Sequence, residues 1–167
     1  MTHSPRSPLA SPPTSEAFRY LPADQESGTV ERWGREFDPM PETLTRRPSH
    51  ADAVVEWVVR ALAEDAVVAS VTLHHHAADR VLGCSLWVAP PFRARGHGRA
   101  IGRELLDWAF AAGVRRVETA HYAEDLTAGR LAERLGLLPE GVQRGALLDA
   151  QGTARDLAHW GLLASDR

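Results

Sequence analysis

Apolar residues recur along the chain with spacings that predict its helices and strands. They follow helical spacing from Val30 to Phe37 and from Val54 to Leu62, so we expect an amphipathic helix in each segment. Ser49 is well placed to cap the second helix, with Asp52 three residues later. Three prolines mark the loop between the two helices: Pro39, Pro41 and Pro48.

Continuous apolar runs predict strands in the next part of the chain. One runs from Val67 to Leu73 and another from Val81 to Ala89, with the polar turn Ala77–Arg80 between them. The remaining predicted elements are a helix around Ile101–Ala109, a strand over Val114–Ala120, a helix over Leu126–Leu135 that ends at Gly136, and a closing hairpin of Gly141–Leu148 and Leu157–Leu163. Strands interspersed with helices predict an α/β fold.

Length and composition fit one globular domain. The chain has 167 residues, of which 44% are hydrophobic and 25% are charged. Residues 1–15 are rich in Pro and Ser and contain too little apolar surface to offset the entropy of ordering. We therefore expect a disordered tail over residues 1–15, followed by a single domain over residues 16–167.

Charge and cysteine content argue against several function classes. The net charge of −3 argues against binding to nucleic acid or to an anionic membrane surface. Cys84 is the only cysteine, which excludes an internal disulfide and a Cys-based zinc cluster. The sequence shows neither a signal peptide nor an apolar run long enough to cross a membrane, so we expect a soluble cytoplasmic protein.

The segment from Arg93 to Arg99 joins a predicted strand to a predicted helix and contains two glycines. A glycine-containing loop that opens a helix presents unpaired backbone N–H groups, and the helix dipole adds positive potential there. The segment is therefore a candidate site for phosphate or pyrophosphate. Its candidate anion-binding residues are Arg93, Arg95, Gly96, His97, Gly98 and Arg99, with His97 acting through its backbone N–H.

Four motifs follow one another in the second half of the chain. They are Trp87-Val88-Ala89-Pro90 running into Arg93-x-x-Gly96-x-Gly98, then Arg130-Leu131-Ala132-Glu133-Arg134-Leu135-Gly136-Leu137, Glu140-Gly141-x-x-Arg144 and Asp156-x-x-x-Trp160-x-Leu162-Leu163. In this order and spacing they resemble the GCN5-related N-acetyltransferases (the GNAT superfamily), of the RimJ/RimL type. The resemblance implies a mixed, mostly antiparallel sheet flanked by helices, with splayed central strands.

The resemblance also implies an activity. Members of this family transfer an acetyl group from acetyl-CoA directly to a primary amine, so acetyl-CoA is the expected cosubstrate and no metal is expected. The pantetheine arm is expected along Trp87 and Val88, with further cofactor contacts from Asp125 and Arg130. The weakly acidic chain favours a small cationic acceptor, such as a metabolite or antibiotic, over a protein N-terminus. The short N-terminal half is consistent with a homodimer.

Two positions depart from the family's pattern. The helix that usually begins with Asn, with Ser three residues later, has Asp125 and Ala128 here. Asp125 can accept a hydrogen bond from pantetheine but cannot donate one. Because Ala128 has no hydroxyl, we expect Tyr122, rather than Thr127, to protonate the leaving thiolate. The chain contains no asparagine and no lysine, which is typical of a GC-rich genome.

The N-terminal half is predicted to be one strand short. Only two strands are predicted between the capped helix and the glycine loop, where the family has a three-strand meander. Losing one strand of a meander reverses the direction in which the chain enters the next strand. We therefore expect a rearranged N-terminal half, or an element supplied by a second copy.

Candidate general bases are Glu118 and His121, near the end of a predicted strand, and the run His74-His75-His76. Strand alternation would send His74 and His76 to one face and His75 to the other. No carboxylate lies in this run, so we expect surface polar residues there rather than a metal site. Cys84 and four tryptophans are expected to pack in the core: Trp57, Trp87, Trp108 and Trp160.

Two functions follow from these features. The first is an acetyl-CoA-dependent N-acetyltransferase. The second is a catalytically weak module that senses acyl-CoA or partners another protein, which the altered residues at 125 and 128 would favour. A different transfer chemistry on the same fold is a third hypothesis, because a fold does not determine its function. Release of free thiol when an amine is added would distinguish the first two.

Overall fold

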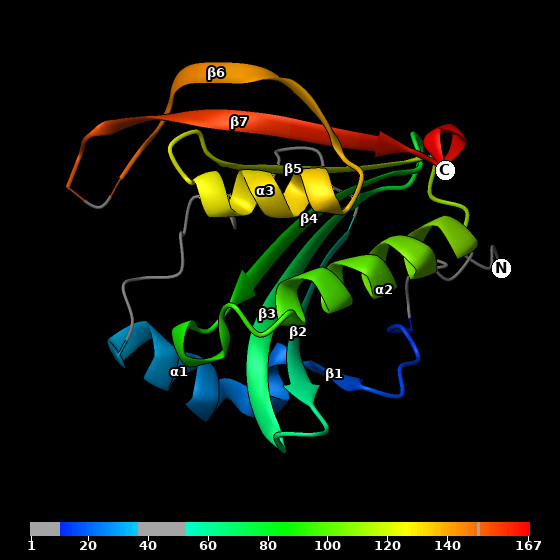
Figure 1. Cartoon of the computed structure of the whole chain (residues 1–167), viewed down its shortest axis with the longest axis vertical. Helices are drawn as coiled ribbons and strands as arrows, with labels where there is room; N and C mark the ends of the chain where they lie inside the picture. Colours follow the sequence, from blue (N-terminus) through cyan, green and yellow to red (C-terminus); the bar gives the residue numbers. More distant parts are fainter. Residues whose placement is uncertain (1–10, 37–52, 150) are drawn as a thin grey trace, which may run out of the picture.

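A computed structural model describes residues 11–36, 53–149 and 151–167. Within these residues lies a seven-stranded sheet in the order β1-β2-β3-β4-β5-β7-β6 (Figure 1). Neighbouring strands are antiparallel except β4 and β5, which are parallel. The elements are β1 (Phe18–Pro22), α1 (Ser27–Glu36), β2 (Ala53–Ala61), β3 (Ala66–His76), β4 (Val81–Val88), α2 (His97–Ala111), β5 (Arg116–Tyr122), α3 (Leu126–Arg134), β6 (Leu138–Leu148) and β7 (Ala154–Leu163). The predicted α/β fold is confirmed.

The segment predicted as the second helix is strand β2, so that prediction was wrong. Strand β2 pairs with β1 on one side and with β3 on the other. Three consecutive residues, Trp57, Val58 and Val59, are at most 5% exposed. The predicted helical stripe would have left Val59 facing solvent. A strand that is covered on both faces is apolar at successive positions, and its β-branched side chains favour the extended backbone.

Strand β2 is also the strand that the sequence predicted to be missing. Strands β2, β3 and β4 form an antiparallel meander built entirely from this chain. The expectation of a fold one strand short, with a rearranged N-terminal half or an element from a second copy, was therefore wrong. Strand β3 also runs on to His76, three residues past its predicted end at Leu73. The predicted cap at Ser49 and Asp52, and the proline loop, lie outside the described residues.

Helices cover both faces of the sheet (Figure 1). Helix α2 packs on the face that carries Trp57 and Leu73. Helix α1 places Trp33 on the opposite face, where its ring centroid lies 5.2 Å from that of Trp87. The helix predicted near residues 30–37 is confirmed as α1, which begins at Ser27. No helix among the described residues is long and apolar enough to span a membrane.

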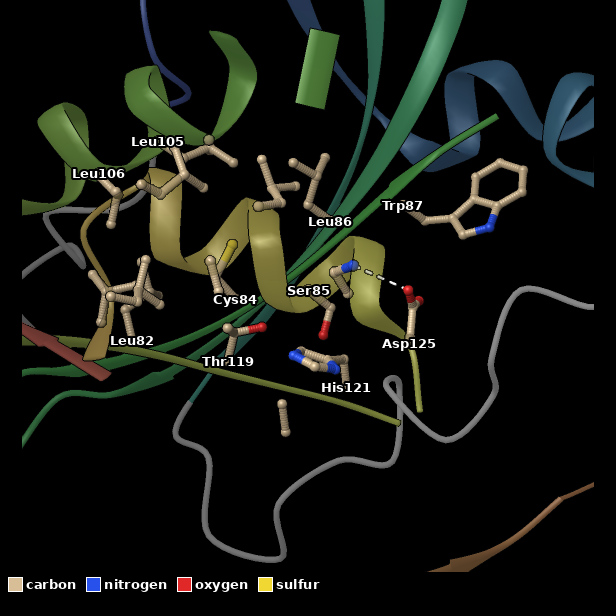
Figure 2. Close-up of a pocket in the computed structure, with 18 of the residues that line it drawn as sticks. Leu82, Cys84, Ser85, Leu86, Trp87, Leu105, Leu106, Thr119, His121 and Asp125 are labelled. Carbon is tan, nitrogen blue, oxygen red and sulfur yellow. Dashed lines mark hydrogen bonds between the residues drawn. The ribbon is translucent and has the colours of Figure 1, made fainter. Parts of the chain in front are cut away.

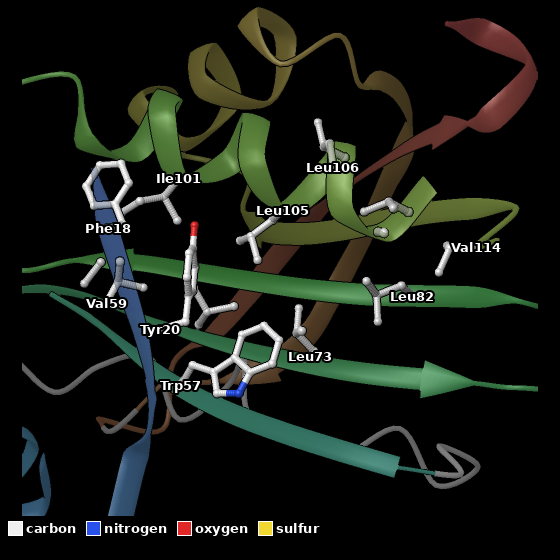
Figure 3. Packing of buried hydrophobic residues seen from close by; sticks show 14 of the residues in the cluster. Phe18, Tyr20, Trp57, Val59, Leu73, Leu82, Ile101, Leu105, Leu106 and Val114 are labelled. Atoms are coloured by element: carbon white, nitrogen blue, oxygen red, sulfur yellow. The ribbon is translucent and has the colours of Figure 1, made fainter. Parts of the chain in front are cut away.

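The main core lies between α2 and strands β1 to β5 (Figure 3). Trp57 packs edge-on against two aromatic rings, with centroids 5.9 Å away at Tyr20 and 5.4 Å away at Trp108. The Tyr20 hydroxyl donates to Glu104 Oε2 at 2.9 Å. Burial, with a smaller effect from Glu104, raises the pKa of Tyr20 far above its usual value. Of the four tryptophans predicted in the core, Trp57 is buried. The other three are half-buried and pack against the buried hydrophobic residues.

Residues 11–15, the described part of the predicted tail, lie on α2. The Trp108 Nε1–H donates to the Ser11 carbonyl at 3.0 Å. The Ser15 hydroxyl donates to Glu104 Oε1 at 2.7 Å. This segment therefore lies against α2 beside Glu104 and Trp108, which also contact Tyr20 and Trp57.

Candidate active site

Strands β4 and β5 pair at one end and then diverge. Their pairing joins Val81–Gly83 to Arg116–Glu118. Beyond these residues β4 stays paired with β3, and β5 stays paired with β7. The sheet therefore has a V-shaped opening between its two halves, which confirms the splayed central strands expected from the sequence.

A cavity of about 170 Å³ lies in this opening, between the two strands and helices α2 and α3 (Figure 2). We call it the inner cavity. Leu82 and Leu106 stand at one end of it, and Trp87 and Asp125 at the other (Figure 2). Its wall is mostly apolar, with His121 and Tyr122 among the few polar side chains.

A second cavity of about 530 Å³ lies at the start of α2, and we call it the anion cavity. The glycine loop forms one wall and the first turns of α3 form the other. The anion cavity and the inner cavity share five lining residues: Leu86, Trp87, Asp125, Ala128 and Leu131. The two spaces therefore adjoin along β4, as the expected path for a pantetheine arm requires.

The glycine loop presents backbone N–H groups to the anion cavity. Gly96 has a φ of +87°, which side-chain-bearing residues adopt only with strain, and no side chain caps the first turn of α2. The N–H groups of that turn have no partner within the helix, and they carry the positive end of the helix dipole. An anion is therefore the chemistry that this part of the candidate site favours.

The arginines of the loop have different roles. Arg93 lies over the Trp87 ring at 5.7 Å, and its Nε–H donates to the Val88 carbonyl at 2.9 Å. Arg95 lies over the Phe92 ring at 5.6 Å and does not line the anion cavity. Three arginines line the cavity without such a contact: Arg99, Arg130 and Arg134. Arg134 was not predicted, although it stands in the motif that begins at Arg130.

His97 lines the anion cavity, and its side chain also contacts the β1 side of the fold. Its ring lies edge-on to Phe18, with centroids 5.9 Å apart, and its Nε2 lies 3.1 Å from Glu64 Oε1. The backbone N–H of His97 nevertheless belongs to the first turn of α2. The imidazole therefore connects the glycine loop to the β1 side of the fold.

A third cavity of about 430 Å³ opens on the other side of the V, and we call it the outer cavity. Glu118 faces it from β5, and His74 faces it from β3. The outer and inner cavities share four residues at the V: Cys84, Ser85, Thr119 and Ala120. The V therefore connects the two faces of the sheet.

Arg116 organises the charges of the outer cavity. It donates to Glu140 Oε1 at 2.7 Å through Nη1 and to Glu118 Oε2 at 3.0 Å through Nε. The hydrogen bonds from Arg116 lower the pKa of Glu140. Two carboxylates thus face one guanidinium. Arg116, Glu140 and His159, which also line this cavity, were not predicted as site residues.

Comparison with known proteins agrees with this geometry. Residues 17–137 match the model of the acetyltransferase (GNAT) family, which is well over half of the chain. The chain belongs to the GNAT family. As a member it is an acyltransferase, and the family uses acetyl-CoA. No curated protein matches the chain.

Solved GNAT structures share the fold. A spermidine N-acetyltransferase SpeG chimera from Vibrio cholerae and hSSAT aligns with a TM-score of 0.74 and 17% identity, over 90% of this chain and 97% of that one. The dodecameric spermidine N-acetyltransferase from Vibrio cholerae aligns with a TM-score of 0.72 and 18% identity, over 89% and 93%. Mycobacterium smegmatis RimJ in complex with CoA-disulfide aligns with a TM-score of 0.61 and 22% identity, over 68% and 54%.

Asp125, which replaces the usual Asn of the GNAT family, caps helix α3. Its Oδ1 accepts from the backbone N–H of Thr127 at 3.1 Å and of Ala128 at 3.0 Å. The dashed line at Asp125 in Figure 2 marks the second of these bonds. Such a cap needs only an acceptor, which Asp supplies as well as Asn. The same side chain lines both the inner and the anion cavity.

Removing this cap is expected to destabilise the protein. Asp125→Ala should lower the free energy of unfolding by about 1 kcal/mol, whereas Asp125→Asn should stay close to the wild type because it keeps the acceptor. Urea denaturation of the three proteins measures the difference. Equal losses in the two variants would show that the cap is not what Asp125 contributes.

His121 lies in the wall of the inner cavity. Its Nδ1 is 2.7 Å from the Tyr122 carbonyl, which can only accept, so Nδ1 carries the proton of this hydrogen bond. Nε2 is buried without a hydrogen-bond partner among the described residues. The ring stacks on Trp160 at 6.1 Å between centroids. A neutral His121 therefore presents a lone pair on Nε2, fixed in direction by its neighbours.

Burial corrects the expectation that the run His74-His75-His76 lies at the surface, and it also places His121 inside the protein. His74, His75 and His121 are only 5%, 6% and 8% exposed. Because β3 extends through the first two, they belong to the sheet rather than to a solvated turn. Among the described residues there is no cluster of His, Cys, Asp or Glu that could hold a metal ion.

The other predicted residues of β4 and β5 divide between the two faces. Strand alternation sends His121 to the inner cavity and Glu118 to the outer one. Tyr122 lines the inner cavity at its open end, with Arg155 over its ring at 5.9 Å. Cys84 lines both cavities, and burial raises the pKa of its thiol to about 12. Cys84 is therefore a neutral thiol at pH 7 and a poor nucleophile.

Proposed function

We propose that this protein transfers an acetyl group from acetyl-CoA to a primary amine of a small cationic molecule, with a protein N-terminus as the less favoured acceptor. The observation that carries the proposal is the series of three adjoining cavities. The anion cavity opens into the inner cavity, and the inner cavity meets the outer cavity at the V. A thioester that enters from one face can thus be reached by an amine from the other.

The anion cavity fits the diphosphate of CoA. Its donors are the backbone N–H groups of Gly98 and its neighbours, which no side chain caps, with Arg99, Arg130 and Arg134 around them. Guanidinium groups bind phosphate oxygens through paired N–H donors. Val88 and Trp87 line the path from this cavity to the V, so they would flank the pantetheine arm. Arg93 would support this path by holding the Val88 carbonyl.

The outer cavity suits a cationic amine. Glu118 and Glu140 share the single guanidinium of Arg116, so this side of the V has an excess of negative charge. An excess of carboxylate attracts an ammonium group and orients it by hydrogen bonds. We therefore assign Glu118 to binding the acceptor rather than to accepting its proton.

The reaction needs two proton transfers at the V. Acetyl-CoA, when bound, supplies a thioester carbonyl that an amine nitrogen can attack, so that a C–N bond forms and the C–S bond breaks. An ammonium acceptor loses two protons overall, of which one ends on the thiolate and one reaches solvent. We assign His121 as the base, whose Nε2 accepts a proton from the ammonium group. We assign Tyr122 as the acid, whose hydroxyl donates a proton to the leaving thiolate.

Thermal unfolding and thiol release test the proposal together. Acetyl-CoA should raise the melting temperature, and addition of a suitable small diamine or polyamine should release free thiol above the hydrolysis background. Arg99→Ala should raise the KM for acetyl-CoA about tenfold with little change in kcat, because the loop binds rather than reacts. Arg103→Ala, an exposed arginine one turn later on α2, is the matched control.

The outcomes separate the alternatives. Stabilisation by CoA without thiol release on any amine would contradict acetyl transfer and favour an acyl-CoA-binding module. The absence of any stabilisation by CoA would contradict both functions. The cytoplasmic location and the homodimer stay predictions.

A further inference from the structure

We infer that the inner cavity holds the acyl chain of a CoA thioester longer than acetyl, with roughly four to six carbons in the chain. The inference rests on the proposed function and extends it, because the same site would take these longer CoA thioesters as well as acetyl-CoA. It follows from three features of the inner cavity: its direction, its lining and its size.

The direction of the cavity follows from its neighbours. A CoA thioester would enter beside Trp87 and Asp125, where the inner cavity adjoins the anion cavity. Its carbonyl carbon must lie at the V, beside Cys84 and Thr119, because only there does the outer cavity give an amine access. The acyl chain then continues away from the entrance, toward Leu82 (Figure 2).

The lining beyond the V is apolar and closed to solvent. Five residues there are at most 7% exposed and yet border open space: Leu82, Leu105, Leu106, Val117 and Leu137. None of these side chains can hydrogen-bond a ligand. An alkyl chain is the chemistry that such a wall favours, because its burial removes apolar surface from water.

The size of the cavity exceeds what an acetyl group needs. The whole inner cavity has a volume of about 170 Å³, which includes the entrance beside Trp87 and Asp125 that the thioester itself would occupy. For comparison, an apolar cavity of about 150 Å³ in another protein takes up benzene, and a water molecule occupies about 30 Å³. An acetyl group ends in a single methyl. An empty apolar space costs folding stability, so its presence beyond the V points to a ligand that fills it.

Two small residues keep this end of the cavity open. Ala132 lines it from α3, and Gly102 lines it from α2. A Cβ on Gly102 would lie 2.6 Å from Leu135 Cδ1, so a larger residue there forces the Leu135 side chain to move. Since Leu135 also lines the cavity, that movement would narrow it. Either position therefore sets how long an acyl chain can be.

Calorimetric titration with acetyl-, butyryl-, hexanoyl- and decanoyl-CoA tests the inference without requiring an acceptor. For the wild type, the Kd should fall by about fourfold for each added methylene, as far as butyryl or hexanoyl, and rise again for decanoyl. Ala132→Leu fills the space beyond the V. It should bind hexanoyl-CoA at least tenfold more weakly than the wild type, with its acetyl-CoA Kd within about threefold.

Two further variants complete the test. If Ala132→Leu does not fold, Gly102→Ala serves in its place. It adds only one methyl group and should also weaken the binding of hexanoyl-CoA. Ala111→Leu makes the same substitution at an exposed position at the end of α2 and should keep the wild-type profile. A Kd that stays constant or rises from acetyl-CoA onward would overturn the inference, as would an unchanged hexanoyl-CoA Kd in both cavity variants. Failure of every CoA thioester to bind would instead reject the proposed function with it.

Discussion

Replacing His121 by alanine is expected to lower kcat by about 100- to 1000-fold, the range typical of losing a general base. The acetyl-CoA affinity should change by less than about threefold, because the anion cavity is formed by other residues. The physical reason is the fixed direction of Nε2. The Tyr122 carbonyl holds Nδ1 at 2.7 Å and Trp160 stacks on the ring, so the imidazole is held in one orientation in the wall of the inner cavity. Steady-state kinetics with acetyl-CoA and an accepted amine give kcat and KM separately.

Chemical rescue distinguishes a catalytic role of His121 from a purely structural one. Added imidazole should restore part of the activity of His121→Ala, since it can enter the space that the side chain leaves and accept a proton there. A purely structural role would not be restored in this way. His76→Ala, at the end of β3 and away from all three cavities, serves as the histidine control. Retention of more than a tenth of the wild-type kcat in His121→Ala would reject the assignment.

Trp57→Ala is expected to have the largest effect on stability, a loss of about 3–5 kcal/mol in the free energy of unfolding. Trp57 is 5% exposed and packs edge-on against both Tyr20 and Trp108. Its removal leaves a cavity where β1, β2 and α2 meet, and backbone pairing on both sides of β2 limits how far the structure can collapse into it. A loss of this size approaches the whole stability of many domains.

Urea denaturation measures this effect, with Trp57→Phe as the conservative control. Phenylalanine keeps an aromatic ring of smaller volume at this position. The loss in the free energy of unfolding for Trp57→Phe should therefore be less than half of the loss for Trp57→Ala. A loss below about 1 kcal/mol for Trp57→Ala would mean that this residue is not at the centre of the core. It would also weaken the assignment of Ala53–Ala61 as a central strand.

The glycine loop was predictable because its chemistry is local. Two glycines and several arginines between a strand and a helix predict an anion site from neighbouring residues alone, and the structure confirms that this loop opens helix α2. The separate roles of the arginines were not predictable. Arg93 and Arg95 lie over Trp87 and Phe92, whereas Arg134 reaches the anion cavity from another helix. Sequence spacing cannot show which cations already have an aromatic partner.

The catalytic candidates show the same limit. Alternation along β5 separates Glu118 from His121, but only the sheet order shows that one faces a polar cavity and the other an apolar one. Arg116, which neutralises part of the charge of Glu118, had no signal in the sequence because its second partner, Glu140, is 24 residues away. Burial of His74 likewise depends on strands that pair with it on both sides.

By itself the sequence determined the elements whose signals are local: the glycine loop before α2, helix α2 itself, helix α3 with its end at Gly136, and the closing hairpin of β6 and β7. It led to a helix for the segment Ala53–Ala61, which was wrong, because seven apolar residues among nine fit a buried helix face and a strand covered on both faces equally well. Only the tertiary structure decided between them, through backbone pairing with β1 and β3. The V between β4 and β5, and the three cavities that meet along it, also exist only in three dimensions, since they arise where the pairing of distant strands stops.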